Sequence, residues 1–413
     1  MISNRFQSAL LPRQSLISYP EILKILKKHL SQILNHTGEH RERYFNAVSP
    51  PVIQSSNFAF DSLESFRAAF ADEFGAHLYT RGNNPTVEIL RKKLAELERT
   101  EDALVFGSGS AAIAAAVLSQ VQVGDHIVCV QNPYSWTATL MTSFLARFGV
   151  SHSFVDGTDT NAIREAIRPE TRVLFLESPN TLTYNCQDLR ACADICREHG
   201  LTSIIDNSYA GPIFQRPAEF GIDLICHSGT KYLNGHSDVV CGVVCGSEQQ
   251  IRRIFSGEYQ TLGAIISPHD AALVLRGLRT LELRMQRVHD STGQIAERLE
   301  KHPGIRRVLW PLLPSFPQYE LARRQMSGAG GLFSFELDTD DRTTAESFFD
   351  RLKRFALAVS WGGHESLIIP TVAFYGIPGR ADSPLPVGFV RMYIGLEDPE
   401  WLWEDLVSAL EGL

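Results

Sequence analysis

The stretch HSGTKYLNGHSD, residues 227–238, contains a lysine that could do chemistry. Lys231 stands among small hydroxyl residues and glycines, directly after the apolar run IDLIC, and the next charged residue along the chain is Asp238. A second candidate is Asp206, which ends the apolar run LTSIID. A third is FGSGSAA, residues 106–112, a glycine-rich turn that follows an apolar run and opens an alanine-rich stretch. An amine, a carboxylate and a helix N-terminus at the ends of apolar segments could bind and activate one ligand.

Each of these features has an ordinary explanation when it is taken alone. Asp206 could cap a helix N-terminus, and the glycine-rich turn could be a tight turn without a ligand. However, a lysine amine with a lowered pKa can form a Schiff base with an aldehyde, and an aspartate can hold the proton of a pyridinium ring. Helix N-termini bind phosphate, and Ser228 and Thr230 flank the lysine with hydroxyl groups that could do so too. The combination indicates a pyridoxal phosphate (PLP) site.

The elements that must position these residues alternate between short apolar strands and helices from about residue 85 to 270. This pattern predicts an α/β domain, a parallel sheet with helices on both faces. Ligands bind at the carboxyl ends of the strands in such sheets. We therefore predict a PLP-binding domain over residues 77–268. The polar residues at the predicted strand ends are 107–110, 177–180, 206–208 and 228–231.

The segments on either side have a different character. Residues 1–76 are predicted to form an N-terminal arm with an amphipathic helix between Pro20 and Gly38. Such an arm cannot bury itself, so it is expected to clasp another domain or subunit, although its basic residues leave a membrane-surface role open. Residues 269–413 are predicted to form a smaller α+β domain. In that domain GLFSFEL, residues 331–337, alternates like a half-buried strand.

Composition excludes several classes of function. The chain has 413 residues and a net charge of −8, so a basic nucleic-acid surface is not expected. No apolar stretch is long enough for a membrane span. The seven cysteines are odd in number and lack the usual zinc spacings. They are expected to be buried, reduced thiols in a cytoplasmic protein without a bound metal.

From about residue 40 to its end, the chain resembles the PLP-dependent Cys/Met-metabolism family. This family includes cystathionine γ-synthases, cystathionine β- and γ-lyases and methionine γ-lyases. The resemblance implies fold type I, with a large mostly parallel-sheet domain, a smaller α+β C-terminal domain and an N-terminal arm. It also implies a homotetramer of paired dimers with active sites shared between subunits. The motifs that carry it are HSGTKYLNGHSD, YTRGNNPT (79–86), SGSAA, DNS (206–208), LRGLRTLELRMQR (275–287), SWGGHESL (360–367) and VRMYIGLED (390–398).

The resemblance assigns roles to the matching positions. Lys231 would form the Schiff base and shuttle protons, Asp206 would pair with the pyridine nitrogen, and Tyr134 would stack on the ring and take part in proton transfer. Arg391 would clamp the α-carboxylate of the substrate together with Ser360. The cofactor phosphate would be held by Gly109, Ser110, Ser228 and Thr230, and by Tyr79 and Arg81 of a neighbouring subunit. Tyr79 and Trp136 are further candidates for contacts with the substrate.

Departures from the family pattern bear on specificity. In YSWT, Trp136 stands where a small residue or a cysteine is common, so it could narrow the substrate pocket or pack behind it. Thr181 stands where an asparagine often contacts the ring oxygen of the cofactor. In VSWGG, the tryptophan is typical of β-lyases, whereas Val359 resembles γ-lyases.

The function implied is a PLP-dependent lyase that eliminates a β- or γ-substituent from an L-amino acid. A carbon–sulfur lyase of the cystathionine or methionine type is the first hypothesis. The alternative is γ-elimination or γ-replacement on an unusual γ-substituted amino acid with a non-sulfur leaving group. A PLP-binding homologue without turnover is a third reading, which retention of the residues for catalysis disfavours.

Overall fold

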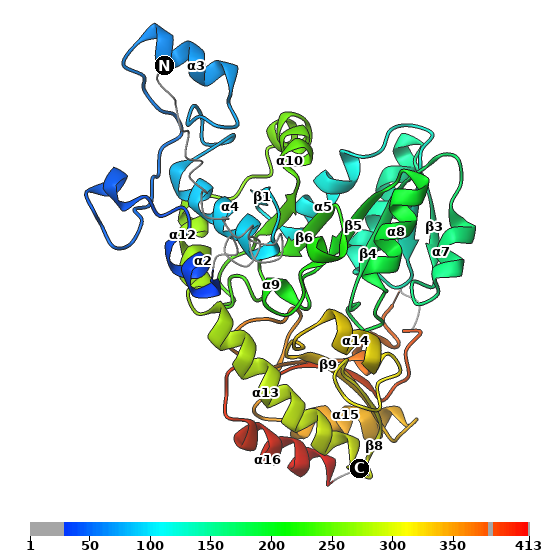
Figure 1. The fold of residues 1–413 in the computed structure, drawn as a ribbon. Coiled ribbons are helices and arrows are strands. Elements are labelled where there is room, and N and C mark those ends of the chain that lie inside the picture. The colour runs from blue at the N-terminus through cyan, green and yellow to red at the C-terminus, as the bar shows by residue number, and fades with distance from the viewer. Residues whose placement is uncertain (1–28, 379–382, 412–413) are drawn as a thin grey trace, which may run out of the picture.

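The computed structural model describes residues 29–378 and 383–411. The chain forms a large sheet with its helices, a smaller sheet with its helices, and an N-terminal arm (Figure 1). About half of the predicted amphipathic helix, residues 20–28, lies outside the described residues. Its described part is α2 (Leu30–His36), which ends two residues before Gly38. The predicted domain limits at residues 76 and 268 stay predictions.

The large sheet has seven strands in the order β1-β7-β6-β5-β4-β2-β3. Strands β2 to β6 pair in parallel, and β7 runs antiparallel to both of its neighbours. A mostly parallel sheet confirms the predicted α/β class. The strands are β1 (Asp102–Phe106), β2 (His126–Val130), β3 (Ser151–Val155), β4 (Thr171–Glu177), β5 (Thr202–Asp206), β6 (Leu224–Ser228) and β7 (Gly242–Gly246).

Helices cover both faces of this sheet, as the continuous apolar strands predict. In β4, Val173 and Phe175 pack into one hydrophobic cluster, while Leu174 and Leu176 pack into the other on the opposite face. Both faces of the sheet are therefore apolar and buried under other elements. The covering helices are α4 (Pro85–Glu98), α5 (Gly109–Leu118), α7 (Thr160–Ala166), α8 (Leu189–His199) and α10 (Glu248–Ile254).

The helical segment that ends at Gly149 is irregular. It begins as α6 (Ser135–Thr139), widens into the π-helical turn η2 (Leu140–Phe144) and tightens into the 3-10 turn η3 (Leu145–Phe148). Gly149, at φ +71°, ends it in the left-handed conformation that favours glycine. Other short helical elements are α9 (Gly211–Phe214), η4 (Pro217–Phe220), η5 (Phe255–Tyr259) and α11 (Gln260–Leu262).

The smaller sheet has the order β10-β11-β12-β9-β8. The prediction of a half-buried strand was wrong, because all six residues of β9 are buried. The hydroxyl of Ser334 in β9 donates to the carbonyl of Leu182 and contacts the hydroxyl of Tyr184, so the large domain covers the polar face of this strand. The strands are β8 (Ile305–Leu309), β9 (Leu332–Leu337), β10 (Ala356–Leu357), β11 (Leu367–Pro370) and β12 (Phe389–Tyr393).

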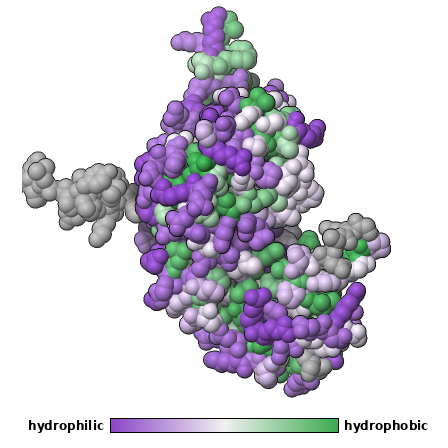
Figure 2. All heavy atoms as spheres, turned by 90° about the vertical axis from the view of Figure 1, so that its right-hand side faces the viewer, coloured by the Kyte–Doolittle hydropathy of each residue, from purple (hydrophilic) through white to green (hydrophobic). Residues whose placement is uncertain are grey.

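The helices of this region pack around the smaller sheet, and α13 and α16 lie side by side (Figure 1). No helix in the described ranges is long and apolar enough to cross a bilayer. The face in Figure 2 is mostly hydrophilic, with hydrophobic side chains gathered in smaller areas. The elements are α12 (Pro268–Leu278), α13 (Leu281–Glu300), α14 (Tyr319–Gln325), α15 (Arg342–Arg351), η6 (Thr371–Phe374) and α16 (Pro399–Leu410).

The arm is attached to the large domain at several places, among them hydrogen bonds between residues 51–53 and Thr86. Two of the attachments involve charged side chains of the large domain. The amine of Lys93 on α4 pairs with the carboxylate of Glu39 at 3.1 Å, and both side chains are buried. Helix α3 (Leu63–Ala71) follows η1 (Arg41–Tyr44) in the sequence and precedes the large domain. It stands away from the body of the fold (Figure 1).

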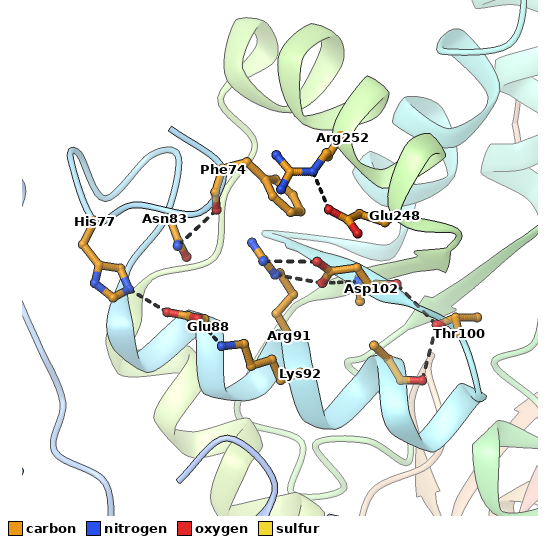
Figure 3. A network of polar contacts seen from close by, with 12 residues as sticks. Phe74, His77, Asn83, Glu88, Arg91, Lys92, Thr100, Asp102, Glu248 and Arg252 are labelled. Atoms are coloured by element: carbon orange, nitrogen blue, oxygen red, sulfur yellow. Dashed lines mark hydrogen bonds and ion pairs between the residues drawn. The ribbon is translucent and has the colours of Figure 1, made fainter. Parts of the chain in front are cut away.

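The second attachment is Phe74, whose ring lies between two guanidinium groups (Figure 3). Arg91 lies 4.2 Å and Arg252 lies 4.4 Å from the ring centroid. Cation–π contacts of this kind are attractive and add to the hydrophobic packing of Phe74, which is buried. They anchor the segment that leads to Tyr79.

Candidate active site

Three neighbouring parallel strands end in polar residues at one edge of the large sheet. Strand β4 ends at Glu177, β5 at Asp206 and β6 at Ser228. Glu177 and Asp206 are direct partners in the register of their strands. Because parallel strands bring their carboxyl ends to one edge, the topology places the predicted polar strand ends together.

Lys231 follows β6 at this edge. Its amine donates a hydrogen bond to the hydroxyl oxygen of Ser360 at 2.5 Å and lies 5.4 Å from the centroid of the Trp361 ring. Burial and the nearby guanidinium of Arg391 lower the pKa of Lys231 to about 8, although Asp206 opposes this shift. A larger fraction of neutral amine is therefore present near neutral pH, as a nucleophilic lysine requires.

The loop that carries Ser360 packs tightly against Lys231. Ser360 has φ +82°, a conformation that is costly for a residue other than glycine. A Cβ atom on Gly362 would lie 2.8 Å from the Cα of Lys231, so only glycine fits there. The smaller domain thus supplies a strained loop that directs a hydroxyl group to the lysine.

Asp206 is buried, and one of its oxygens is already engaged. Its Oδ1 accepts hydrogen bonds from the backbone N–H of Ser208 at 2.9 Å and from the Ser208 hydroxyl at 2.5 Å. Burial raises the pKa of Asp206, while these two bonds and the positive field of Lys231 lower it. Oδ2 accepts no hydrogen bond within residues 29–378 and 383–411. It can therefore receive a proton donor from a ligand.

The start of α5 provides donors for an anion. The hydroxyl of Ser108 caps this helix by accepting from the N–H of Ala111 at 3.1 Å. The N–H groups of Gly109 and Ser110 lie in the first turn, where a helix offers them no partner. A Cβ on Gly109 would lie 2.9 Å from the Cα of Ser228, so glycine allows the helix start to approach β6. The two predicted phosphate-binding segments are therefore in contact.

Thr230 is held differently from Ser228. Its hydroxyl donates to the carbonyl of Cys241 at 3.3 Å and accepts from the N–H of the same residue at 3.0 Å. A hydroxyl has one proton to donate. To bind a phosphate oxygen, Thr230 would have to turn away from this carbonyl.

Arg391 comes from β12 and reaches the site from the smaller domain. Its Nη1 donates to the hydroxyl oxygen of Thr181 at 3.3 Å. Burial lowers the pKa of Arg391, whereas Tyr184 and Tyr134 raise it. Within residues 29–378 and 383–411 this largely buried guanidinium has no carboxylate partner, so it is suited to bind the carboxylate of a ligand. Thr181 thus faces the predicted substrate clamp.

Two aromatic residues of the YSWT segment lie at the open side of the site. Tyr134 is 40% exposed and Trp136 is 62% exposed. Trp136 is on α6, and its two predicted roles stay predictions. Val359, next to Ser360, is 77% exposed. Apolar surface therefore flanks the site on both domains.

Tyr79 and Arg81 are not brought to Lys231. Arg81 donates to Gln260 at 3.2 Å, and its guanidinium lies 5.4 Å from the centroid of the Tyr79 ring. Neither side chain has a hydrogen bond, ion pair or ring contact with Lys231 or Asp206 in the part of the chain that the structure describes. Both line a separate pocket of about 400 Å³ beside Gly263.

Sequence reasoning gave no role to Glu177. This carboxyl is 5% exposed and accepts a hydrogen bond from the backbone N–H of Tyr134 at 2.7 Å. Burial and the negative field of Asp206 raise its pKa to about 8. Its place at the end of an apolar strand, like that of Asp206, was the signal in the sequence.

The residues present fit PLP. Lys231 offers an amine for the aldehyde, Asp206 offers a free carboxylate oxygen for the pyridine nitrogen, and the start of α5 offers N–H groups for the phosphate. In the described residues there is no group of three or more histidine, cysteine, aspartate or glutamate side chains that could hold a metal ion.

Comparisons with known proteins agree with this site. A family model described as Cys/Met metabolism PLP-dependent enzyme matches residues 31–411. The L-methionine gamma-lyase of Pseudomonas putida is 39% identical over 91% of this chain and 96% of the relative. The cystathionine beta-lyase of Coxiella burnetii is 38% identical over 93% of this chain and 98% of the relative. The cystathionine gamma-lyase of Bacillus subtilis is 35% identical over 92% of this chain.

A solved structure is similar in fold. The crystal structure of metB from Corynebacterium glutamicum has a TM-score of 0.85 and 31% sequence identity, and the match covers 93% of this chain and 98% of that one. The comparisons confirm the predicted family resemblance, the fold type I architecture and PLP as the cofactor.

Proposed function

Because the chain belongs to the PLP-dependent enzymes of Cys/Met metabolism, we propose that it is a carbon–sulfur lyase that removes a β- or γ-substituent from an amino acid of the cystathionine or methionine type. The observation that carries this proposal is the meeting of Lys231, Asp206 and Arg391 at one edge of the sheet. The names of relatives at 35–39% identity support the same class of reaction.

PLP supplies the electron sink that stabilises negative charge at the substrate Cα. Arg391 binds the α-carboxylate and thereby orients the Cα–H bond, and Ser360 assists it. The amine of Lys231 accepts the Cα proton and can return a proton to the departing group or to Cγ. Asp206 remains ionised and holds the proton on the ring nitrogen. Tyr134 covers the ring and can take part in proton transfer.

A specific observation supports a second candidate function. Trp136 and Val359 place apolar side chains on both sides of the site, and both are exposed in this chain. Such surface would suit a substrate with an apolar γ-substituent, whichever atom leaves. The second candidate is γ-elimination or γ-replacement on an amino acid whose leaving group is not sulfur.

One experiment separates these functions. The protein is incubated with cystathionine, methionine, homocysteine and γ-substituted homoserines, and products are identified by mass spectrometry. Pyruvate would indicate β-elimination, 2-oxobutanoate would indicate γ-elimination, and a substituted amino acid would indicate replacement. Turnover of none of these substrates would contradict the lyase proposal and favour a binding protein without turnover.

We also propose a homotetramer whose active sites are shared between subunits. Helix α3 has exposed apolar residues, with Leu63 at 70%, Phe66 at 41% and Phe70 at 55% exposure. A second copy of the chain would cover them. Tyr79 and Arg81, which do not reach Lys231 of their own chain, would contact the cofactor phosphate of a neighbour.

Mixed oligomers test this sharing. Arg81→Ala and Lys231→Ala proteins are each expected to be weakly active or inactive. If the sites are shared, oligomers assembled from the two variants contain some sites with both native residues and should recover part of the activity. No recovery in mixed oligomers, verified by native mass spectrometry, would contradict the sharing of sites.

A cytoplasmic location is part of the same proposal. All seven cysteines are buried and unpaired. Thiols persist without disulfides in reducing compartments.

A further inference from the structure

Glu177 is a buried acid that the reaction described above does not use. It ends β4 directly beside Asp206 of β5. Within the described ranges, no lysine, arginine or histidine forms an ion pair with it. A buried carboxyl is costly unless it is hydrogen-bonded or loses its charge. Its hydrogen-bond partners therefore indicate why it is present.

The first partner belongs to the segment that carries the stacking tyrosine. The backbone N–H of Tyr134 donates to Oε2 of Glu177 at 2.7 Å. Tyr134 is the N-cap residue of α6, and its own side chain makes no capping hydrogen bond. Glu177 therefore holds the point at which this short helix starts, and with it the direction of the Tyr134 ring.

The second partner belongs to the loop after β4. The backbone N–H of Thr181 also faces the Glu177 carboxyl group and lowers its pKa. The side chain of Thr181 in turn accepts a hydrogen bond from Arg391 at 3.3 Å. A single carboxyl group thus connects the ring-stacking segment with the loop that contacts the substrate clamp.

The charge of Glu177 is linked to that of Asp206. Two adjacent carboxyl groups in a buried site cannot both ionise easily. Burial and Asp206 raise the pKa of Glu177 to about 8, whereas the N–H groups of Tyr134 and Thr181 lower it. A protonated Glu177 leaves the negative charge on Asp206 and still accepts hydrogen bonds through its carbonyl oxygen.

We propose that Glu177 is a positioning residue that fixes Tyr134 and, through Thr181, Arg391 at the mouth of the active site. It acts through its hydrogen bond from the Tyr134 N–H and its contact with the Thr181 N–H, and not through its charge. The roles of Tyr134 and Arg391 toward the ligand rest on the proposed function, whereas these two backbone contacts belong to this chain alone.

The test compares three substitutions in the full-length protein, with and without PLP. Glu177→Ala removes both backbone contacts, Glu177→Asp keeps the carboxyl group but shortens the side chain by one methylene, and Glu177→Gln keeps an acceptor oxygen without an ionisable group. Asp102→Asn is the matched control, because Asp102 is a largely buried carboxyl that pairs with Arg91 (Figure 3) and not with a predicted site residue. If the Ala variant does not fold, the Asp variant provides the comparison with the wild type.

Hydrogen–deuterium exchange is the readout that does not depend on activity. In the Ala and Asp variants, amides in residues 131–140 and 180–184 should exchange at least about tenfold faster, as expected for the loss of a buried hydrogen bond. The Gln variant should recover most of the protection. In the lyase assay, the Ala and Asp variants should raise KM by about tenfold, with Gln closer to the wild type.

The outcomes are separable. Unchanged exchange in the Ala and Asp variants would overturn the proposal, and so would a Gln variant with protected amides but kinetics as poor as those of Ala. The second result would assign the effect to the charge of Glu177. If the wild-type protein shows no lyase turnover, the proposed function fails, and the exchange data still decide whether Glu177 positions the two segments.

Discussion

Two groups of charged residues in the large domain, one at the strand ends and one partly exposed beside α4, are organised in opposite ways. At the strand ends, Lys231, Asp206 and Glu177 have no oppositely charged group within ion-pair distance in the described part of the chain. On α4, the carboxylate of Glu88 contacts the amine of Lys92 and lies 2.7 Å from the ring of His77 (Figure 3).

The pKa shifts follow from this difference. Lys231 and Glu177 are both shifted to about 8, each toward its neutral form, because burial is not compensated by a close partner. Burial also acts on Glu88, but hydrogen bonds from His77 and Lys92 outweigh it and lower its pKa to about 2. Ionisable groups with strongly shifted pKa values and no close partner are candidates for a role in catalysis or binding. Groups in an ion pair are expected to stabilise the fold instead. Three predictions test that distinction.

The largest effect is expected at the unpaired amine. Lys231→Ala should abolish the visible absorbance of the bound cofactor and lower lyase turnover by roughly 1,000-fold or more, because the group that moves the proton is absent. Absorbance spectra and peptide mass mapping after borohydride reduction provide the measurement. A cofactor adduct found on another lysine of the variant would show that Lys231 is not the anchor.

A smaller effect is expected at the buried guanidinium. Arg391→Ala should raise KM by about 10- to 100-fold, with less change in kcat, because a charged hydrogen-bonding partner of the substrate is lost. Steady-state kinetics measure this. A carboxylate-free analogue of the substrate should bind the variant and the wild type equally well. Unaltered kinetics would remove Arg391 from the site.

The smallest effect is expected at the paired carboxylate on α4. Because the folded-state pKa of Glu88 is lowered to about 2, its stabilisation is present above the unfolded pKa and is lost as the pH falls through the folded pKa. Glu88→Gln should lower the free energy of unfolding by about 1 kcal/mol at neutral pH, after allowance for solvent screening. The difference from the wild type should shrink at about pH 3.

Denaturant titrations at both pH values measure this difference. Glu346→Gln is the control, because its carboxylate forms an exposed pair with Arg342 on α15 and should contribute little. A Glu88 variant with an altered KM would show that the α4 cluster is not purely structural, and the contrast between the two groups would fail.

Much of the site could be predicted from local patterns. Apolar runs that end in polar residues predicted the strands before Asp206 and Lys231, and their parallel order predicted one shared edge. Glu177 also ended such a run, yet its role depends on the N–H of Tyr134, 43 positions earlier in the chain. A hydrogen bond between distant segments leaves no periodic signal in a sequence.

The error about strand β9 has the same origin. The strand alternates in sequence, but the loop after β4 covers its polar face, so it is buried on both sides. The role of Thr230 as a phosphate ligand stays a prediction, and the structure shows its hydroxyl paired with Cys241. Alternation and residue type describe one segment, whereas burial and hydrogen bonding depend on what packs against it.

The sequence by itself determined the α/β order of elements, the chemical types at the strand ends and the cofactor that they suit, because these depend on local periodicity and side-chain chemistry. Only the tertiary structure decided which residues these groups contact and how their pKa values shift. It placed the hydroxyl of Ser360 against Lys231, joined Glu177 to the segments of Tyr134 and Thr181, and left Tyr79 and Arg81 remote from Lys231. The reason is physical: desolvation and short hydrogen bonds act over a few ångströms in space, between residues far apart in the chain.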